Sequence, residues 1–329
     1  MKTKKKYILL FLAIICIVIG VTVYNYVEEL DRKDRIKNIK DTTIHEQTET
    51  LDEYKNSISK NDISILAIGN SDLYSGLNPL QLWHEKGYTC YISGEPSQDI
   101  YRAYITLKET LKFQRPSLII FDVDEIFNGE RMDEESALVH VAMNTFPIAQ
   151  EYSLWKNLRA SDFKNVKNYD KNYLLRMKTK GYLYKTKIVA RKTKDSYMKN
   201  TNKIAKIQDN VKNDLKKMIS LAKEKDIKLL FIAIPSARSW TMQKHNAINQ
   251  IANQYNIPFL DLNLKLNDID IDWNKDSRDG GTHLNYYGAK KATKYIGDYI
   301  QNNYNIIDYR NNSIMKEWDK EYEKFINSR

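Results

Sequence analysis

The fold is decided around the stretch ILAIGNSD at residues 65–72. Its first four residues are all apolar, and a glycine and three polar residues follow. A strand without polar alternation is typical of a parallel sheet covered by helices on both faces, because neither side of such a strand meets water. We therefore expect a buried parallel strand, followed by a turn that carries Asn70, Ser71 and Asp72.

Working outward, the same kind of apolar run recurs along the chain. The first run starts at residue 63, and the others span residues 88–92, 118–123, 227–234 and 257–262. Helical patterns separate these runs at residues 98–113, 204–224, 240–255 and 287–303. Strands that alternate with helices indicate a parallel sheet with helices on both faces. The sequence predicts a three-layer α/β/α domain over residues 62–303, with a five-stranded parallel sheet.

The alternation stops between residues 128 and about 203, which we interpret as an insertion with helices of its own near the mouth of the site. From Lys156 to Lys203 there are 15 Lys or Arg residues against three Asp residues, more positive charge than the chain's net +10. One interpretation is a solvated lysine-rich surface. The other is attraction of an anionic partner: a phosphate-rich envelope polymer, lipid headgroups or an acidic membrane protein.

The N-terminus predicts a location outside the cytoplasm. Four lysines within the first six residues precede an uncharged apolar run from Tyr7 to about Tyr24. This length is just enough to cross a bilayer, and the lysines predict a cytoplasmic N-terminus. A cleaved signal peptide is the alternative, but residues 20–23 fit its cleavage site poorly. We expect a lysine cluster and membrane anchor over residues 1–27, a helical or flexible spacer over 28–61, and a C-terminal tail over 304–329.

The cysteines give no support for a disulfide or a metal. Cys16 lies in the predicted membrane span and Cys90 in an apolar run, so the two are not expected to pair. Without a cluster of cysteines and histidines we expect neither a metal nor another cofactor. The predicted topology also excludes nucleic acid as a partner.

Candidate catalytic residues directly follow several of the predicted strands. Active sites of open parallel sheets lie beyond the carboxyl ends of the strands. Ser71 follows the first strand, Gly94 the second, and His283 the fifth. A serine becomes a nucleophile when a base takes its proton and an acid orients that base. The pattern predicts a hydrolase or acyltransferase site, with a helix cap as the alternative role of Ser71. The remaining histidines are interpreted as structural or solvated: His45, His84, His140 and His245.

These motifs resemble the SGNH (GDSL-like) hydrolase superfamily, whose domains are flavodoxin-like. The resemblance rests on GNSD at residues 69–72, and on an acid and His283 close together near the end of the domain. It covers about residues 61–302 without the insertion. The anchor, together with THLN at residues 282–285, is similar to the DltD-like and O-acetylation SGNH proteins that partner membrane-bound O-acyltransferases.

The resemblance implies that Ser71 is acylated and that His283 is the base. The orienting acid of the family usually stands three residues before the histidine, where this chain has Gly280. We take Asp279 as that acid and Asp276 as its substitute.

The resemblance also implies an oxyanion hole formed by the amides of Ser71 and Gly94. The asparagine expected after the third strand is missing, and slow hydrolysis follows, because losing one donor costs about 10²- to 10³-fold in rate. Asp72 and Asn285 are candidate substrate contacts. Their alternative roles are a helix cap for Asp72 and positioning of the His283 loop for Asn285.

The sequence thus predicts extracytoplasmic O-acyl transfer onto a cell-envelope polysaccharide or teichoic-acid-like polymer through an acyl-enzyme. The expected partners are that glycopolymer, the membrane through the N-terminal helix, and a membrane-bound O-acyltransferase. One alternative is a membrane-anchored carbohydrate or peptidoglycan acetylesterase. The other is a non-catalytic scaffold for the O-acyltransferase.

Overall fold

The computed structural model describes residues 63–111, 114–127, 179–193 and 196–328, together with Ala137, Arg176 and scattered positions between 15 and 33. Five strands within these ranges form one parallel sheet in the order β2-β1-β3-β4-β5. The strands are β1 (Ile65–Gly69), β2 (Cys90–Gly94), β3 (Leu118–Asp122), β4 (Lys228–Ala233) and β5 (Phe259–Asp261). The predicted five-stranded parallel sheet is confirmed, and its strand order is that of flavodoxin-like folds.

The four helical patterns correspond to long helices. These are α4 (Ile100–Thr110), α8 (Asp209–Glu224), α9 (Met242–Tyr255) and α11 (Tyr286–Asn303). Other described helices are α2 (Ser71–Gly76), α3 (Pro79–Lys86), α10 (Leu266–Ile269), α12 (Lys316–Asn327), and the 3-10 turns η1 (Val123–Phe127), η4 (Leu262–Leu264) and η5 (Ser313–Met315). Helix α8 begins five residues later than predicted, because the segment before it bonds to α9 instead, through the amide of Ala205 and the carbonyl of Gln243.

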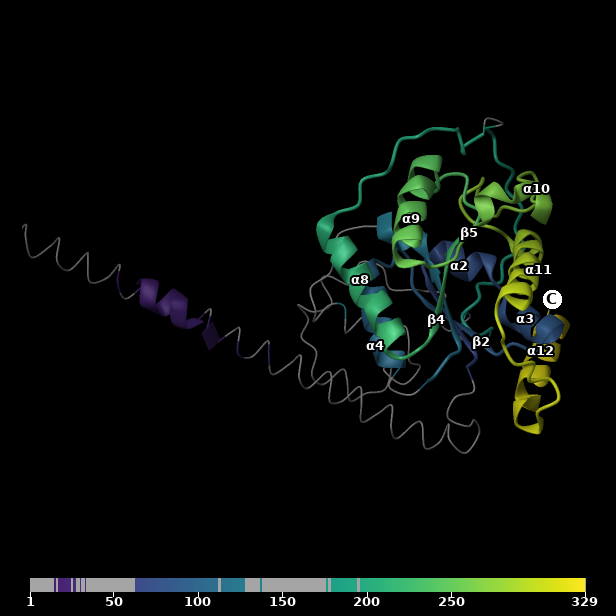
Figure 1. Cartoon of the computed structure of the whole chain (residues 1–329), viewed down its shortest axis with the longest axis horizontal. Helices are drawn as coiled ribbons and strands as arrows, with labels where there is room; N and C mark the ends of the chain where they lie inside the picture. The colour runs from purple at the N-terminus through teal and green to yellow at the C-terminus, as the bar shows by residue number, and fades with distance from the viewer. Residues whose placement is uncertain are drawn as a thin grey trace, which may run out of the picture.

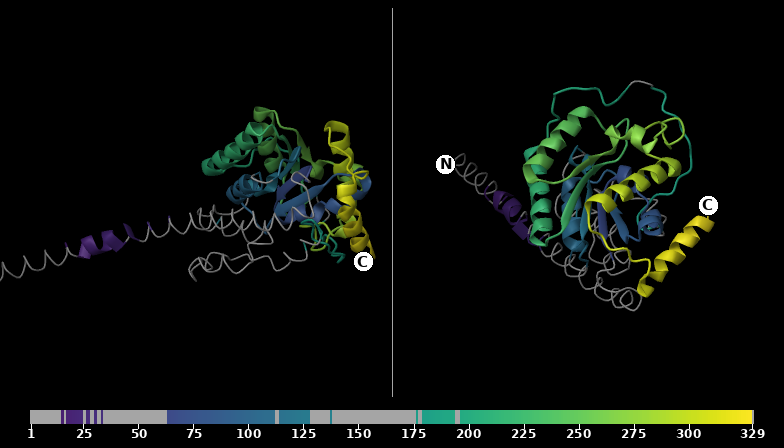
Figure 2. Two further views of the ribbon diagram at one scale, coloured as in Figure 1. Left: turned by 90° about the horizontal axis from the view of Figure 1, so that it is seen from below. Right: turned by 45° about the vertical axis from the view of Figure 1, so that its right-hand side comes forward.

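The sheet separates two apolar cores, which explains why its strands are apolar throughout. In β1, Ile65 and Ala67 belong to the core beneath α3, α11 and α12, whereas Leu66 and Ile68 belong to the core beneath α4, α8 and α9. Figure 1 shows these two groups of helices on opposite sides of the sheet, and Figure 2 shows the same separation from two further directions.

The C-terminal tail packs on the domain, which answers a question that the sequence left open. Helix α12 lies against α3, where the rings of Trp318 and Trp83 are 5.7 Å apart between centroids. The indole N–H of Trp83 donates a 2.9 Å hydrogen bond to Asp319. On the same helix, Phe325 follows Trp318 by seven residues and contacts the ring of Tyr182.

The last part of the predicted insertion runs as an extended segment, residues 182–191, which we call the strap. Its hydrogen bonds join it first to α2, through the Leu183 amide and the Tyr74 carbonyl (2.7 Å). Further along, the Val189 amide donates to the Ser277 carbonyl (2.8 Å) and the Arg191 amide to Trp273 (3.0 Å). The strap therefore borders the loop that carries Asp279 and His283.

Several predictions fall on residues that the structure does not describe. They include most of the membrane anchor over residues 1–27, most of the spacer over 28–61, and most of the helical insertion over about 128–203, whose described residues 179–193 and 196–203 contain no helix. Among the described residues, no helix combines the length and the apolar character needed to cross a membrane. The anchor, the spacer and the domain boundaries remain predictions.

Candidate active site

Ser71 is the first residue of helix α2, at the carboxyl end of β1. The helix cap is Asn70, whose side-chain oxygen accepts a 2.8 Å hydrogen bond from the Asp72 amide. The alternatives in which Ser71 or Asp72 caps this helix are therefore wrong. With Asn70 as the cap, the hydroxyl of Ser71 is free to take part in other contacts.

The structure brings Ser71, His283 and Asp279 together in one hydrogen-bonded row. The Ser71 Oγ lies 2.9 Å from the Nε2 of His283, although the two residues are 212 positions apart. On the other side of the ring, Nδ1 lies 2.5 Å from the Oδ2 of Asp279. The arrangement has the order nucleophile, base and orienting acid.

Asp279 is suited to hold His283 in one orientation. Its Oδ1 accepts hydrogen bonds from the amides of His283 (2.8 Å) and Thr282 (3.2 Å), so both carboxylate oxygens contact the histidine segment. Partial burial acts to raise the pKa of Asp279, but the hydrogen bonds from His283 outweigh it and hold this pKa at about 2. An ionised Asp279 accepts a hydrogen bond from the N–H at Nδ1 of His283. The other ring nitrogen, Nε2, then carries a lone pair that faces Ser71.

Asp276, the substitute acid, has a different task. Its buried Oδ2 pairs with Lys291 of α11 at 2.8 Å and accepts the Asp272 amide at 2.7 Å. The choice of Asp276 as the orienting acid is therefore wrong. Between Asp279 and His283 the backbone turns through Gly280 and Gly281, with φ of 83° and 102°. This left-handed turn lets an acid four residues before the histidine reach its ring.

The contacts of Asn285 favour its expected role in positioning the His283 loop over a role as a substrate contact. It is buried, and its Oδ1 caps α11 by accepting the amides of Tyr287 (3.0 Å) and Gly288 (3.1 Å). Its amide nitrogen donates to the Lys275 carbonyl at 2.6 Å. Both ends of the side chain are thus used to join the catalytic loop to α11.

Gly94 lies at the same edge of the sheet as the start of α2. It pairs in register with Gly69, the last residue of β1. A Cβ atom at Gly94 would stand 1.9 Å from the Gly69 carbonyl oxygen, so only glycine fits. This places the Gly94 backbone close to the turn that carries Ser71, as an oxyanion donor requires. Its role as a donor remains a proposal.

The carboxyl end of β3 carries acids where the sequence resemblance implied an asparagine. Asp122, Asp124 and Glu125 are buried there, next to Asp72 of α2. Burial, reinforced by the neighbouring carboxylates, raises the pKa of Asp72, Asp122 and Glu125 well above the ordinary range. Asp124 pairs with Lys244 at 2.8 Å. The sequence pattern predicted that the site lies at this edge of the sheet, but it did not predict that buried acids with raised pKa values gather there.

Three further residues lie near the triad and were not predicted from the sequence. Ser236 and Ser239 follow β4, and Ser239 contacts Asp72 at 3.0 Å. Arg278 precedes Asp279 and lies 3.8 Å from its carboxylate. Polar residues directly after an apolar strand were the available signal for the two serines, because that position is the active edge of the sheet.

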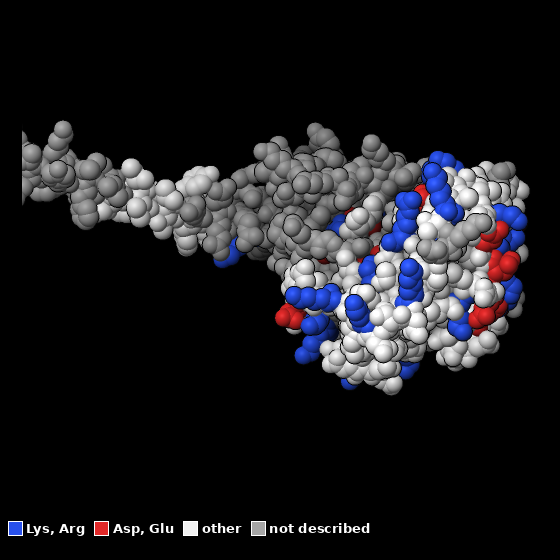
Figure 3. All heavy atoms as spheres, turned by 90° about the horizontal axis from the view of Figure 1, so that it is seen from above, with Lys and Arg blue, Asp and Glu red and all other residues white. Residues whose placement is uncertain are grey.

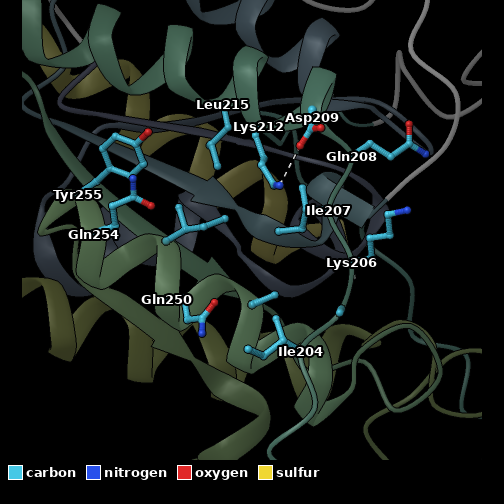
Figure 4. Close-up of a pocket in the computed structure, with 13 residues that line it drawn as sticks. Ile204, Lys206, Ile207, Gln208, Asp209, Lys212, Leu215, Gln250, Gln254 and Tyr255 are labelled. Carbon is cyan, nitrogen blue, oxygen red and sulfur yellow. Dashed lines mark hydrogen bonds and ion pairs between the residues drawn. The ribbon is translucent and has the colours of Figure 1, made fainter.

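A hollow of about 740 Å³ lies away from the triad, between α8, α9 and the segment before α8 (Figure 4). Ile204, Leu215 and Tyr255 contribute apolar walls, and the ion pair of Lys212 with Asp209 lies beside them. No member of the triad lines this hollow. Within the described ranges, no three or more His, Cys, Asp or Glu residues are grouped as a metal site.

Fold and site together define a doubly wound α/β protein with a Ser-His-Asp triad at the carboxyl edge of its sheet. No known family and no curated protein matches the sequence.

Solved structures with a similar fold include a Bacteroides fragilis protein described as an acylhydrolase, with 15% identity and a TM-score of 0.37, covering 75% of this chain and 90% of that one. A GDSL-like lipase of Bacteroides thetaiotaomicron has 14% identity and a TM-score of 0.37, over 72% of this chain and 87% of the lipase. TesA has 9% identity and a TM-score of 0.36, over 72% of this chain and 98% of TesA.

Proposed function

We propose that this chain forms an acyl-enzyme on Ser71 and transfers the acyl group to a hydroxyl of a cell-envelope polysaccharide or teichoic-acid-like polymer. The observation that carries the proposal is the 2.9 Å contact between Ser71 Oγ and His283 Nε2, with Asp279 on the opposite ring nitrogen. A serine in this setting is activated for attack on a carbonyl carbon.

In the first half of the reaction, Ser71 Oγ bonds to the carbonyl carbon of the donor ester while its proton passes to His283 Nε2. The charge on the carbonyl oxygen is held by the amides of Ser71 and Gly94. When the carbonyl re-forms, the bond to the leaving group breaks and Nε2–H protonates the departing oxygen. Asp279 stabilises the imidazolium through Nδ1–H throughout.

In the second half, Nε2 takes the proton of an acceptor hydroxyl, whose oxygen attacks the acyl carbon. Collapse of this second intermediate returns the proton to Ser71 Oγ and releases the new ester. Water in place of the acceptor gives hydrolysis, which is the acetylesterase alternative. We expect hydrolysis to be slow, because the residues directly after β3, Val123 to Phe127, include no asparagine to serve as a third oxyanion donor.

The proposed location and acceptor are supported by charge and by the N-terminal sequence. The apolar run after the lysine cluster predicts an anchor that leaves the domain outside the cytoplasm. Figure 3 shows Lys and Arg side chains spread over the face seen from above, with most of the visible Asp and Glu side chains near its right-hand edge. On the strap, Lys187 is exposed and Arg191 partly exposed beside the catalytic loop. Such a surface attracts phosphate-bearing polymer or lipid.

The acyl-enzyme is tested by treating the purified full-length protein with a fluorophosphonate serine probe and locating the adduct by mass spectrometry. We expect one adduct on Ser71, lost in Ser71→Ala and His283→Ala. The matched control is Ser75→Ala, a second serine of α2 whose hydroxyl bonds the Ser71 carbonyl and not the histidine. It should keep the adduct. An adduct that survives in Ser71→Ala would overturn the proposal.

Transfer and hydrolysis are separated by a second measurement with an aryl acetate as donor. A transferase should release the aryl alcohol faster when a glycan acceptor is added and should acetylate that glycan. An acetylesterase should release the aryl alcohol at the same rate with and without the glycan and should leave the glycan unacetylated. A folded chain that never takes an acyl group, yet supports O-acylation with Ser71→Ala, would indicate the scaffold alternative.

A further inference from the structure

Asp72 has a place in the site that the proposed acyl transfer leaves unexplained. Its side chain is buried, and Oδ1 has no hydrogen-bond partner among the residues that the structure describes. That oxygen lies 3.8 Å from His283 Nε2, the same nitrogen that contacts Ser71. A second carboxyl group therefore faces the catalytic end of the imidazole, opposite the ring nitrogen held by Asp279.

The other carboxyl oxygen, Oδ2, begins a row of short contacts. It lies 3.0 Å from Ser239 Oγ, which lies 2.5 Å from Ser236 Oγ. Ser236 Oγ in turn lies 2.6 Å from the carbonyl oxygen of Thr282. The row joins the turn after β1 to the residue next to His283.

Counting protons in this row bears on the protonation state of Asp72. A carbonyl can only accept, so the Ser236 hydroxyl donates to Thr282. The contact between Ser239 and Ser236 then needs the Ser239 proton, because the Ser236 proton is already used. The three contacts need three protons and the two hydroxyls supply two. The Ser239 hydroxyl is within donating distance of both Ser236 Oγ and Asp72 Oδ2. When it donates to Ser236, the proton of the Ser239–Asp72 contact comes from the carboxyl group.

The surroundings of Asp72 agree with this count. Burial, which is the largest cause, and repulsion by the acids of β3 and η1 raise the pKa of Asp72 well above the ordinary range, and they outweigh the Ser239 hydrogen bond and the Lys244 charge, which lower it. Of the cations that face it, Lys244 is already paired with Asp124, and Arg278 is close to Asp279. The ionisable groups around it are Asp122, Asp124, Lys244, Arg278 and His283.

We propose that Asp72 is a neutral carboxylic acid that completes the Ser239–Ser236–Thr282 row, and that its neutrality leaves His283 free to accept the proton of Ser71. Ionised carboxylates at both ends of the ring would together favour the imidazolium form. An imidazolium has no lone pair for the Ser71 hydroxyl. Asp72 is thus a positioning residue, and this second part of the proposal rests on the proposed role of Ser71.

The substitution Asp72→Asn in the full-length chain tests the proposal directly. An asparagine reproduces a neutral acid, since its N–H can donate to Ser239 while its oxygen faces His283. We expect Ser71 to react with the fluorophosphonate probe within about threefold of the wild-type rate, with an unchanged pH profile. Asp72→Ala lacks both groups and should react about tenfold more slowly, the effect of one lost hydrogen bond.

If Asp72 instead acts as an ionised carboxylate, Asp72→Asn should react 10²-fold or more slowly and its pH profile should move. That result would overturn the proposal.

Infrared difference spectra of the unreacted protein give a readout that needs no nucleophile. At neutral pH, wild type minus Asp72→Asn should contain a carboxylic-acid C=O band. The matched control, wild type minus Asp276→Asn, should contain carboxylate bands, because Asp276 pairs with Lys291. Carboxylate bands in the wild type minus Asp72→Asn spectrum would show that Asp72 is ionised and would contradict the proposal.

Should Asp72→Asn fail to fold, NMR of the wild-type chain with isotope-labelled aspartate reports the same protonation state. A neutral Asp72 in a chain that takes no probe would overturn the acyl-enzyme while supporting the protonation assignment.

Discussion

Single residues decide which acid serves the histidine. Asp276 and Asp279 lie in one loop and both precede His283, so spacing alone did not separate them. Their contacts do, because Asp276 pairs with Lys291 while Asp279 contacts the His283 ring. The glycines between Asp279 and His283 allow the turn that brings this acid to the ring.

Replacing Asp279 by Asn should lower the rate of Ser71 labelling by about 10⁴-fold, the loss found when a triad acid becomes an amide and the histidine takes the wrong tautomer. Asp276→Asn is the matched control: it should label at the wild-type rate and lose stability instead, since a buried partner of Lys291 is altered. Stopped-flow labelling and thermal unfolding measure the two effects. Equal losses of labelling in both variants would contradict the assignment.

The depressed pKa of Asp279 also predicts the sign of a pH effect on stability. A carboxyl group whose folded pKa is about 2, below its unfolded value of about 3.9, stabilises the fold above the unfolded value. This contribution is lost as the pH falls through about 2. The stability difference between wild type and Asp279→Asn should therefore be constant near neutral pH and shrink below about pH 4. A difference that grows on acidification would refute this.

At the scale of elements, the C-terminal helix shows how a polar sequence is held by a few aromatic contacts. Only Trp318 and Phe325 of α12 are buried, and Trp318 packs on Trp83 and beneath the Lys180 ammonium, 4.6 Å from the ring centroid. The two buried residues form one apolar face of the helix. The structure shows that it covers α3 of the same domain.

Trp318→Ala should therefore destabilise the folded chain by about 3 kcal/mol, within the range for a buried tryptophan. Ile326→Ala is the control from the same helix, because Ile326 is 36% exposed and should change stability by less than about 0.5 kcal/mol. Urea unfolding followed by circular dichroism measures both. Similar effects of the two substitutions would mean that α12 is not docked through Trp318.

At the scale of the whole molecule, the buried acids at the carboxyl end of β3 lower the stability of the folded chain when the pH is high enough for them to ionise in the unfolded chain. Glu125 is fully buried, and within the described part of the chain neither of its carboxyl oxygens has a hydrogen-bond partner. Burial and the charge of Asp122 raise its pKa well above the ordinary range, against the attraction of Arg102. A group with a raised folded pKa binds its proton more tightly in the native state, so it costs stability as the pH rises above the unfolded value.

We therefore expect Glu125→Gln to gain stability over wild type as the pH rises from about 4.3, by about 1.4 kcal/mol per pH unit until Glu125 ionises in the folded state. At lower pH the two proteins should be equally stable, since both side chains are then neutral. Thermal unfolding of both proteins over a pH series provides the measurement. A stability difference independent of pH would show that Glu125 is ionised or exposed in the native protein.

The sequence by itself determined the sheet and the pairing of Ser71 with His283. Continuous apolar runs specify buried parallel strands, and the carboxyl ends of such strands meet at one edge, which is why Ser71 and His283 could be paired across 212 positions. Only the tertiary structure decided between Asp279 and Asp276, assigned the helix cap to Asn70, and placed Asp72 against His283. Those outcomes depend on which neighbours surround a side chain once distant segments pack together, and a carboxyl group's charge is set by that surrounding rather than by its position in the chain.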